Sequence, residues 1–141
     1  MILIVEDNRE NAELVKLYLE RKAGLESRVC VEGEEVMRLC CSGEVQLVIM
    51  DVQLKRTYLK GRPMGGVELT RELKADSRTC TIPVLLATAH AMREDREQFL
   101  RTSGADGYLT KPVEDLAALL DEVNRLRTRV PVTRERVPPP R

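Results

Sequence analysis

Five polar residues of this sequence follow apolar segments and could together carry out phosphoryl chemistry. Asp51 ends one apolar run, and the pair Glu6 and Asp7 ends another. Thr88 ends a third run, and Lys111 follows a fourth, shorter one. If these runs are strands of one parallel sheet, their carboxyl ends meet at one edge, where ligands bind in such sheets. The sequence therefore predicts three carboxylates, a hydroxyl and an ammonium in one pocket.

Three neighbouring carboxylates are unfavourable unless protons or a cation neutralise them. A set of oxygen ligands suits a hard ion such as Mg²⁺, which usually binds one or two carboxylates, several waters and a phosphate. Aspartate is an established phosphoryl acceptor, and phosphoryl transfer depends mainly on positioning and charge neutralisation. We therefore expect Mg²⁺-dependent phosphorylation of Asp51, with Lys111 and Thr88 contacting the phosphoryl oxygens.

Each of these residues also has a simpler explanation when it is taken alone. An aspartate after an apolar run is usually a turn former or a helix cap. Glu6 and Asp7 could be the acidic first turn of a helix, which the helix dipole favours. Lys111 could be solvated, and Tyr108 could be a half-buried strand residue. The coincidence of all the polar groups at strand ends favours a site.

Segments of helical period separate the apolar runs, and this alternation indicates an α/β fold with a parallel sheet. Asn8 is expected to cap the first helix and Gly24 to end it. We predict five strands and five helices in alternation. The strands are expected at residues 2–5, 28–31, 45–50, 84–88 and 107–110, and the last three helices at 66–75, about 93–102, and beyond Pro112.

Two segments depart from this alternation. Residues 52–65 are expected to be irregular. Residues 130–141 contain four prolines and are expected to form a Pro-rich, disordered C-terminal tail. The helix at 93–102 has few apolar residues, so we expect it to be weakly held and able to shift at little cost.

Composition argues against several classes of function. Lys and Arg total 23, as do Asp and Glu, and there is no Trp. This balance does not favour nucleic acid or a membrane surface as a partner. No segment has the length of a membrane span, and the amino terminus lacks the pattern of a signal peptide, so a cytoplasmic protein is expected. The four cysteines lack metal-site spacing and are expected to be free thiols.

Four motifs together resemble the receiver domain of two-component response regulators. They lie at residues 4–8, 47–51, 87–89 and 104–112, and the resemblance extends from Ile2 to about Arg127. It implies a flavodoxin-like (βα)5 fold with strand order 2-1-3-4-5 and a receiver domain over residues 1–129. It also implies that a histidine kinase or phosphotransfer protein phosphorylates Asp51.

The resemblance assigns a role to each site residue. It implies that phosphorylation moves Thr88 toward the phosphoryl group and lets Tyr108 turn inward. These movements would change the surface of the fourth helix, fifth strand and fifth helix, which would bind a downstream protein or a second copy of the chain. Lys111 would pair with the phosphoryl group. The implied Mg²⁺ ligands are Glu6, Asp7, Asp51 and the backbone carbonyl of Gln53.

The segment after Asp51 departs from the family pattern. It is longer than usual, Gly65 replaces the usual acidic residue, and its charges are Lys55, Arg56, Lys60 and Arg62, with no acidic residue between positions 52 and 66. This basic segment could shield an aspartyl phosphate from water or select a kinase. It could equally be a solvated insertion without a role.

Two other functions remain as alternatives to a phosphorylation switch. A receiver-like adaptor could dock without phosphorylation. A phosphatase of the dehalogenase-like class would need an acid two positions after its nucleophile, where this chain has Gln53. We therefore expect a single-domain switch that catalyses only its own phosphorylation and dephosphorylation and does not bind nucleic acid or membranes.

Overall fold

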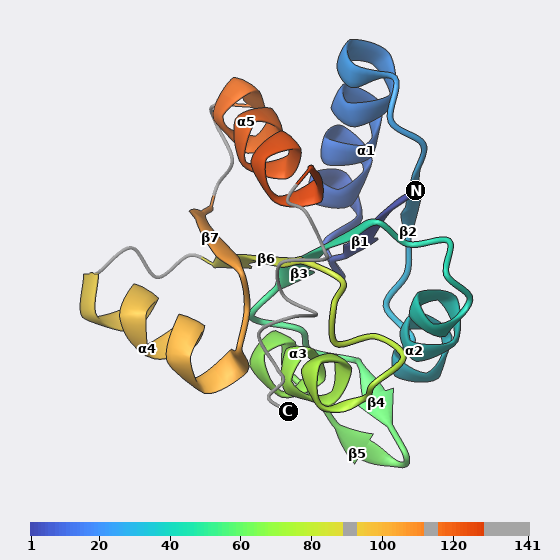
Figure 1. The fold of residues 1–141 in the computed structure, drawn as a ribbon, viewed down its shortest axis with the longest axis vertical. Coiled ribbons are helices and arrows are strands. Elements are labelled where there is room, and N and C mark those ends of the chain that lie inside the picture. The colour runs from blue at the N-terminus through green and yellow to red at the C-terminus, as the bar shows by residue number, and fades with distance from the viewer. Residues whose placement is uncertain (89–92, 112–115, 129–141) are drawn as a thin grey trace.

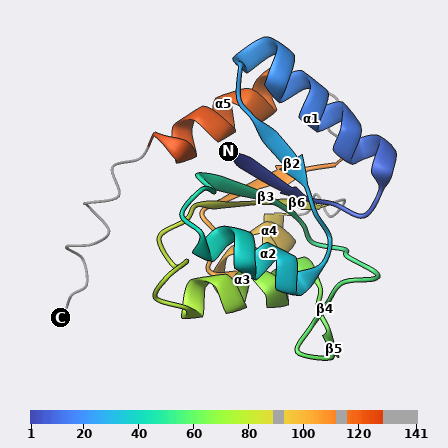
Figure 2. The same ribbon diagram turned by 90° about the vertical axis from the view of Figure 1, so that its right-hand side faces the viewer.

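The fold is a parallel sheet between two layers of helices (Figures 1 and 2). The structure is a computed structural model that describes residues 1–88, 93–111 and 116–128. The expected tail at 130–141 lies outside the described residues, as does Pro112. The five strands of the sheet have the order β2-β1-β3-β6-β7 and are all parallel, which confirms the predicted flavodoxin-like topology. They are β1 (Ile2–Val5), β2 (Ser27–Val29), β3 (Leu47–Asp51), β6 (Val84–Thr88) and β7 (Gly107–Thr110).

Helices cover both faces of this sheet, so the central strands β1, β3 and β6 are buried on both sides. One buried cluster joins the sheet to α1 and α5, and the other joins it to α2, α3 and Phe99 of α4. All four residues of β1 and all five of β3 are buried. The helices are α1 (Arg9–Ala23), α2 (Gly33–Cys41), α3 (Gly66–Ala75), α4 (Arg93–Ser103) and α5 (Leu116–Arg127).

The ends of α1 follow the sequence-based prediction. The Asn8 side-chain oxygen accepts a hydrogen bond from the Asn11 backbone N–H at 3.0 Å, which caps the amino end. Gly24 ends the helix with φ of 66°, in the left-handed region that glycine adopts without strain. The Asn8 cap fixes where α1 begins after β1, and thus where Glu6 and Asp7 lie.

The prediction of an irregular segment over residues 52–65 is wrong in part. Two short strands, β4 (Tyr58–Leu59) and β5 (Arg62–Pro63), form an antiparallel hairpin within it. Lys60 and Gly61 make the turn, and both have positive φ, at 55° and 77°. Positive φ at both central residues is the geometry of the tightest hairpin turns. The second strand, expected at 28–31, is also shorter than predicted.

Lys74 and Asp106 form a half-buried ion pair that no sequence pattern indicates. The Lys74 Nζ lies 2.7 Å from Asp106 Oδ2 and also donates to the carbonyls of Cys80 and Ile82. Asp106 Oδ2 accepts the Val84 N–H at 2.9 Å. These bonds join the end of α3 to the starts of β6 and β7, at the edge of the sheet opposite Asp51.

The cysteines are free thiols, as predicted. Cys40 is buried against the sheet, and burial raises the pKa of its thiol to about 12. It therefore behaves as a small apolar residue. Among the described residues, no helix has both the length and the apolar character that crossing a membrane requires.

Candidate functional site

The predicted carboxylates meet at the carboxyl edge of the sheet. Glu6 and Asp7 follow β1, and Asp51 ends the neighbouring strand β3. One carboxylate oxygen from each lies within 4.8 Å of the other two. Glu6 and Asp51 are buried, whereas Asp7 is half-buried. The parallel pairing of β1 with β3 brings these residues together although they are more than forty positions apart in the sequence.

Lys111 lies between two of the carboxylates. Its Nζ is 2.9 Å from Glu6 Oε1 and 3.3 Å from Asp51 Oδ1. Its backbone N–H donates to the Thr88 carbonyl at 2.7 Å, which holds the end of β7 beside the end of β6. A single ammonium thus neutralises part of the charge of the acidic cluster.

Burial and charge shift the pKa values of this pair. Burial, opposed mainly by the Lys111 hydrogen bond, raises the pKa of Glu6 above 4.5. Burial alone would lower the pKa of Lys111, but the hydrogen bond to Glu6 and the charges of Asp51 and Glu6 outweigh it, so that pKa is raised. Lys111 is therefore charged at neutral pH, and an ionised Glu6 is less stable here than in water.

This shift predicts how stability depends on pH. The raised pKa means that the folded protein holds the Glu6 proton more tightly than the unfolded chain does. The resulting stabilisation is complete at low pH, where Glu6 is protonated in both the folded and the unfolded state. It is lost as the pH rises from about 4.5 through the folded-state pKa. In EDTA, the wild type should therefore lose free energy of unfolding relative to Glu6→Gln as the pH rises over this window. Urea unfolding at a series of pH values measures the difference.

Glu26→Gln, at an exposed glutamate before β2, is the matched control for this pH experiment. Over the same window, the difference from the wild type should change more for Glu6→Gln than for Glu26→Gln. If the difference in free energy of unfolding between the wild type and Glu6→Gln is constant with pH, or changes in the opposite direction, the raised pKa of Glu6 is contradicted.

The geometry of the cluster fits a hard divalent cation. The donors are carboxylate oxygens, which suit Mg²⁺ better than a softer metal. A dication would also offset the repulsion among three carboxylates that Lys111 offsets only in part. Gln53 lies two residues beyond Asp51, and its backbone N–H donates to Asp51 Oδ1 at 3.2 Å. Its side chain is exposed.

Thr88 and Tyr108 lie on the two strands that complete this edge. Thr88 is fully buried at the end of β6, one residue beyond Ala87, which is the register partner of Asp51. Tyr108 is only 7% exposed. Its ring stacks on Phe99 of α4, with 6.4 Å between the centroids, and the Arg96 guanidinium lies 5.6 Å from its centroid. Tyr108 therefore joins β7 to α4.

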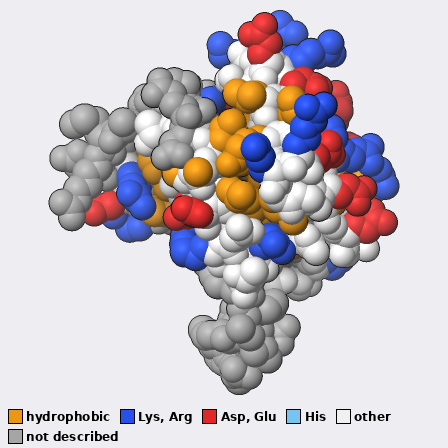
Figure 3. Space-filling model, turned by 90° about the horizontal axis from the view of Figure 1, so that it is seen from above, with side chains coloured by type: hydrophobic (Ala, Val, Ile, Leu, Met, Phe, Trp, Pro, Cys, Tyr) orange, Lys and Arg blue, Asp and Glu red, His pale blue; other side chains and the backbone are white. Residues whose placement is uncertain are grey.

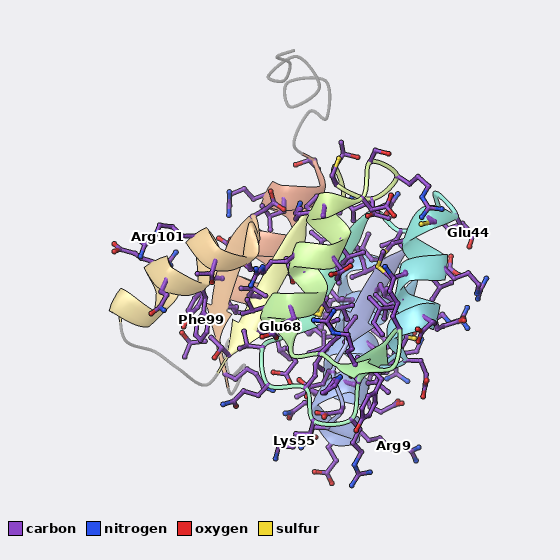
Figure 4. All side chains as sticks on the ribbon, turned by 90° about the horizontal axis from the view of Figure 1, so that it is seen from below. Arg9, Glu44, Lys55, Glu68, Phe99 and Arg101 are labelled. Carbon is purple, nitrogen blue, oxygen red and sulfur yellow. The ribbon has the colours of Figure 1, made fainter. Side chains whose placement is uncertain are left out.

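The segment that follows Asp51 also reaches the cluster, which the sequence analysis did not predict. The Lys55 backbone N–H donates to Asp7 Oδ2 at 2.8 Å, so the segment lies at the rim of the site. No residue type signals this bond, because a backbone group makes it. Figure 4 places the labelled Lys55 and Arg9 at the same edge of the molecule.

A cavity of about 120 Å³ lies beside Asp51 and Lys111, between the sheet and helices α1 and α5. Its lining is mainly apolar and includes Leu14, which is 49% exposed. Leu17, one turn further along α1, is 47% exposed. Figure 3, which views the end of the molecule where α1 and α5 lie, shows apolar side chains gathered on this surface.

Sequence comparison relates this chain to response regulators. Residues 2–124 match the model of the response regulator receiver domain. The chain is 34% identical over 112 residues to the polar-differentiation response regulator DivK of Brucella ovis, covering 79% of this chain and 84% of DivK.

Solved structures resemble the chain over most of its length. The receiver domain of the sensor histidine kinase PA1611 from Pseudomonas aeruginosa, which has a magnesium ion coordinated in its active-site cleft, is 28% identical. Its TM-score is 0.73, with 89% of this chain and 95% of that chain covered. The chemotaxis protein CheY4 of Vibrio cholerae is 25% identical, with a TM-score of 0.74 and coverage of 89% and 96%.

Proposed function

Because this chain belongs to the family of response regulator receiver domains, we propose that it is a switch operated by phosphorylation of Asp51. A histidine kinase or a histidine phosphotransfer protein would donate the phosphoryl group. The observation that carries the proposal is the meeting of Glu6, Asp7 and Asp51 within 4.8 Å, with Lys111 Nζ 3.3 Å from Asp51 Oδ1. We place this reaction in the cytoplasm, where a reducing environment keeps thiols free.

Glu6, Asp7, Asp51 and the Gln53 carbonyl would hold Mg²⁺ in this proposal. When bound, the ion neutralises negative charge on the phosphoryl oxygens and on the carboxylates. The acidic cluster supports this ligand set, because Lys111 pairs with two of its three carboxylates, Glu6 and Asp51, and one ammonium cannot neutralise all three. Lys111 would turn from Glu6 and Asp51 toward a phosphoryl oxygen and keep its charge.

Asp51 is the nucleophile of the proposed reaction. One of its carboxylate oxygens forms a bond to phosphorus while the bond between phosphorus and the donor's histidine nitrogen breaks, and the electron pair of that bond stays on the nitrogen. The product is an aspartyl phosphate, which water later hydrolyses. The chain contributes positioning and charge neutralisation, which carry most of phosphoryl transfer.

Thr88 and Tyr108 would transmit the change to the surface. The Thr88 hydroxyl would move toward the phosphoryl oxygens and favour the buried position of Tyr108, in which its ring lies against Phe99. Of residues 96–103 in α4, only Ser103 is buried, so this helix can shift at low cost. The surface formed by α4, β7 and α5 would then bind a downstream protein or a second copy of the chain.

The exposed leucines of α1 would supply the apolar part of the donor's docking surface. Leu14 and Leu17 are three residues apart, so they lie on one face of the helix. Leu14 also lines the cavity beside Asp51. A protein that brings its phosphohistidine to Asp51 must cover the elements around this opening, and α1 is one of them.

Phosphorylation by a small donor tests the proposal without a partner protein. With Mg²⁺ and acetyl phosphate, the wild type should gain the mass of one phosphoryl group. With EDTA in place of Mg²⁺ the gain should fall at least about tenfold, because the developing charge is no longer neutralised. Intact-mass spectrometry measures both. An unmodified chain under all conditions, with kinases also tried as donors, would favour the adaptor alternative.

A further inference from the structure

The segment after Asp51 carries an unbalanced positive charge at the surface. Residues 55–62, here named the basic hairpin, contain Lys55, Arg56, Lys60 and Arg62 and no acidic residue. All four side chains are exposed. Within the described parts of the chain, none of them forms an ion pair. Arg78 and, more weakly, Lys60 lower the pKa of Asp76, so the charges available to a binding partner are those of Lys55, Arg56 and Arg62.

The basic hairpin is held in place by its contacts with α2. Thr57 and Leu59 are buried, at 2% and 3% exposure. The Lys60 backbone N–H donates to Glu34 Oε2 at 2.6 Å. At Gly33, a Cβ would lie only 2.1 Å from the Tyr58 carbonyl oxygen, so the hairpin backbone lies directly against the start of α2. The exposed charges are thus carried on a fixed backbone, which lowers the entropy lost on binding.

The basic hairpin begins at the opening of the site. The Lys55 backbone N–H binds Asp7 of the acidic cluster, and the following residues extend to α2. When a donor protein places its phosphohistidine at Asp51, the donor surface around that histidine must contact the residues at the edge of the site, including the start of the basic hairpin. Lys55 and Arg56 are the first exposed cations that this surface meets on the side of the β3–α3 segment.

Tyr58 adds an apolar contact among these charges. It is 54% exposed, which makes it one of three large hydrophobic side chains that are exposed in the described residues. Tyrosine and arginine are among the residue types that most often carry binding energy at protein interfaces.

We propose that the basic hairpin is a docking surface for an acidic protein surface next to the phosphohistidine of the donor. This inference rests on the proposed phosphorylation of Asp51 and names the chemistry of its protein partner. A nucleic acid fits the surface less well, because the three carboxylates beside Lys55 would repel a continuous phosphate backbone. The charges accelerate encounter with the donor and select it by complementarity.

Phosphotransfer from protein donors tests this inference. The probes are the histidine kinases and phosphotransfer proteins encoded in the same genome, each purified and phosphorylated from radiolabelled ATP. The variant Lys55→Gln/Arg56→Gln/Arg62→Gln leaves Lys60 in its turn. With the fastest donor at roughly 0.01 M ionic strength, its kcat/KM for phosphotransfer should fall about tenfold, the lower end of electrostatic steering.

A matched variant distinguishes the effect of the position of the charges from the effect of the net charge of the protein. Arg21→Gln/Lys22→Gln/Arg71→Gln removes the same number of exposed charges. Arg21 and Lys22 lie in the last turn of α1, away from the carboxyl edge of the sheet. Its kcat/KM should stay within about twofold of wild type, since surface changes away from an interface alter little. Raising the ionic strength to roughly 0.15 M shortens the Debye length from about 30 Å to about 8 Å. The kcat/KM values of the two variants should then differ less.

Failure of the inference differs from failure of the proposed function. Acetyl phosphate should phosphorylate both variants within about threefold of wild type, because a small donor needs no docking surface. Equal rates for the two variants with the protein donor would overturn the inference and leave the proposed function intact. Phosphorylation by acetyl phosphate but by no protein donor would also overturn it.

A nucleic acid partner would give a different pattern. Binding of a labelled DNA duplex that the hairpin variant loses, with unchanged phosphotransfer, would assign the surface to nucleic acid and overturn the inference. Loss of phosphorylation from every donor in the wild type would instead contradict the proposed function itself.

Discussion

Replacing Asp51 by asparagine is expected to abolish phosphorylation, with a rate at least about a thousandfold lower than wild type, as removal of a nucleophile costs at least this much. Asparagine keeps the shape of the side chain and the oxygen that accepts the Gln53 N–H. It removes the anionic oxygen that attacks phosphorus. Intact-mass spectrometry with Mg²⁺ and acetyl phosphate measures the rate.

Two comparisons make the Asp51→Asn result specific. Its free energy of unfolding should lie within about 1 kcal/mol of wild type, because the change is isosteric and removes one of three neighbouring carboxylates. Asp121→Asn, at an exposed aspartate of α5, should be phosphorylated at the wild-type rate. Phosphorylation of folded Asp51→Asn at a rate close to wild type would show that another residue accepts the phosphoryl group.

Replacing Gly66 by alanine is expected to destabilise the fold by at least about 3 kcal/mol, the upper part of the range for overpacking. A Cβ at Gly66 would lie 2.1 Å from the Asp51 carbonyl oxygen and 2.8 Å from the Val52 Cα. Both are backbone atoms, so relief requires the end of β3 to move away from α3. Alanine favours a helix over glycine by only about 1 kcal/mol, which does not offset this clash.

Gly65→Ala is the matched control for Gly66→Ala. A Cβ there would lie 2.7 Å from Glu68 Oε1, at the end of a flexible side chain, and 3.3 Å from the Val52 carbonyl oxygen. The side chain can move, so we expect a loss of about 1 kcal/mol or less, as is usual for tolerated changes. Urea unfolding measures both variants, and equal stability of Gly66→Ala and wild type would contradict the close packing of α3 on β3.

The framework of the site could be predicted from the sequence because local signals and hydrophobic pattern agree. The apolar runs that end in Glu6, Asp51 and Thr88 are strands, and parallel pairing brings their ends together. Asn8 caps α1 as predicted, because capping depends on a few adjacent residues. The resemblance to receiver domains supplied the strand order, which local pattern alone does not determine.

The features that were not predicted depend on tertiary contacts. The β4–β5 hairpin has two residues in each strand, too few for a pattern of alternation, and it is stabilised by packing on Gly33 and by the bond to Glu34. The Lys74–Asp106 pair joins residues that are far apart in sequence and would otherwise pass for solvated charges. The bond from Lys55 to Asp7 uses a backbone N–H, which every residue except proline has.

These contacts change how the segment after Asp51 is understood. The sequence indicated a long basic insertion that could have been free in solvent. In the structure it is a hairpin with a fixed backbone that begins at Asp7 and packs on α2. The segment that departs most from the family pattern therefore lies next to the acidic cluster, and this position is the geometric basis for proposing the basic hairpin as a docking surface.

The most direct test of the proposed function is to locate the phosphoryl group after transfer. The chain would be phosphorylated with Mg²⁺ and acetyl phosphate, reduced at once with borohydride, digested and sequenced by tandem mass spectrometry. Borohydride converts an aspartyl phosphate to homoserine, so the product identifies the acceptor. We predict homoserine at position 51 in the phosphorylated sample and unmodified Asp51 in the sample with EDTA. Homoserine at another aspartate, or none after a measured gain of phosphoryl mass, would contradict the assignment of Asp51 as the phosphoacceptor.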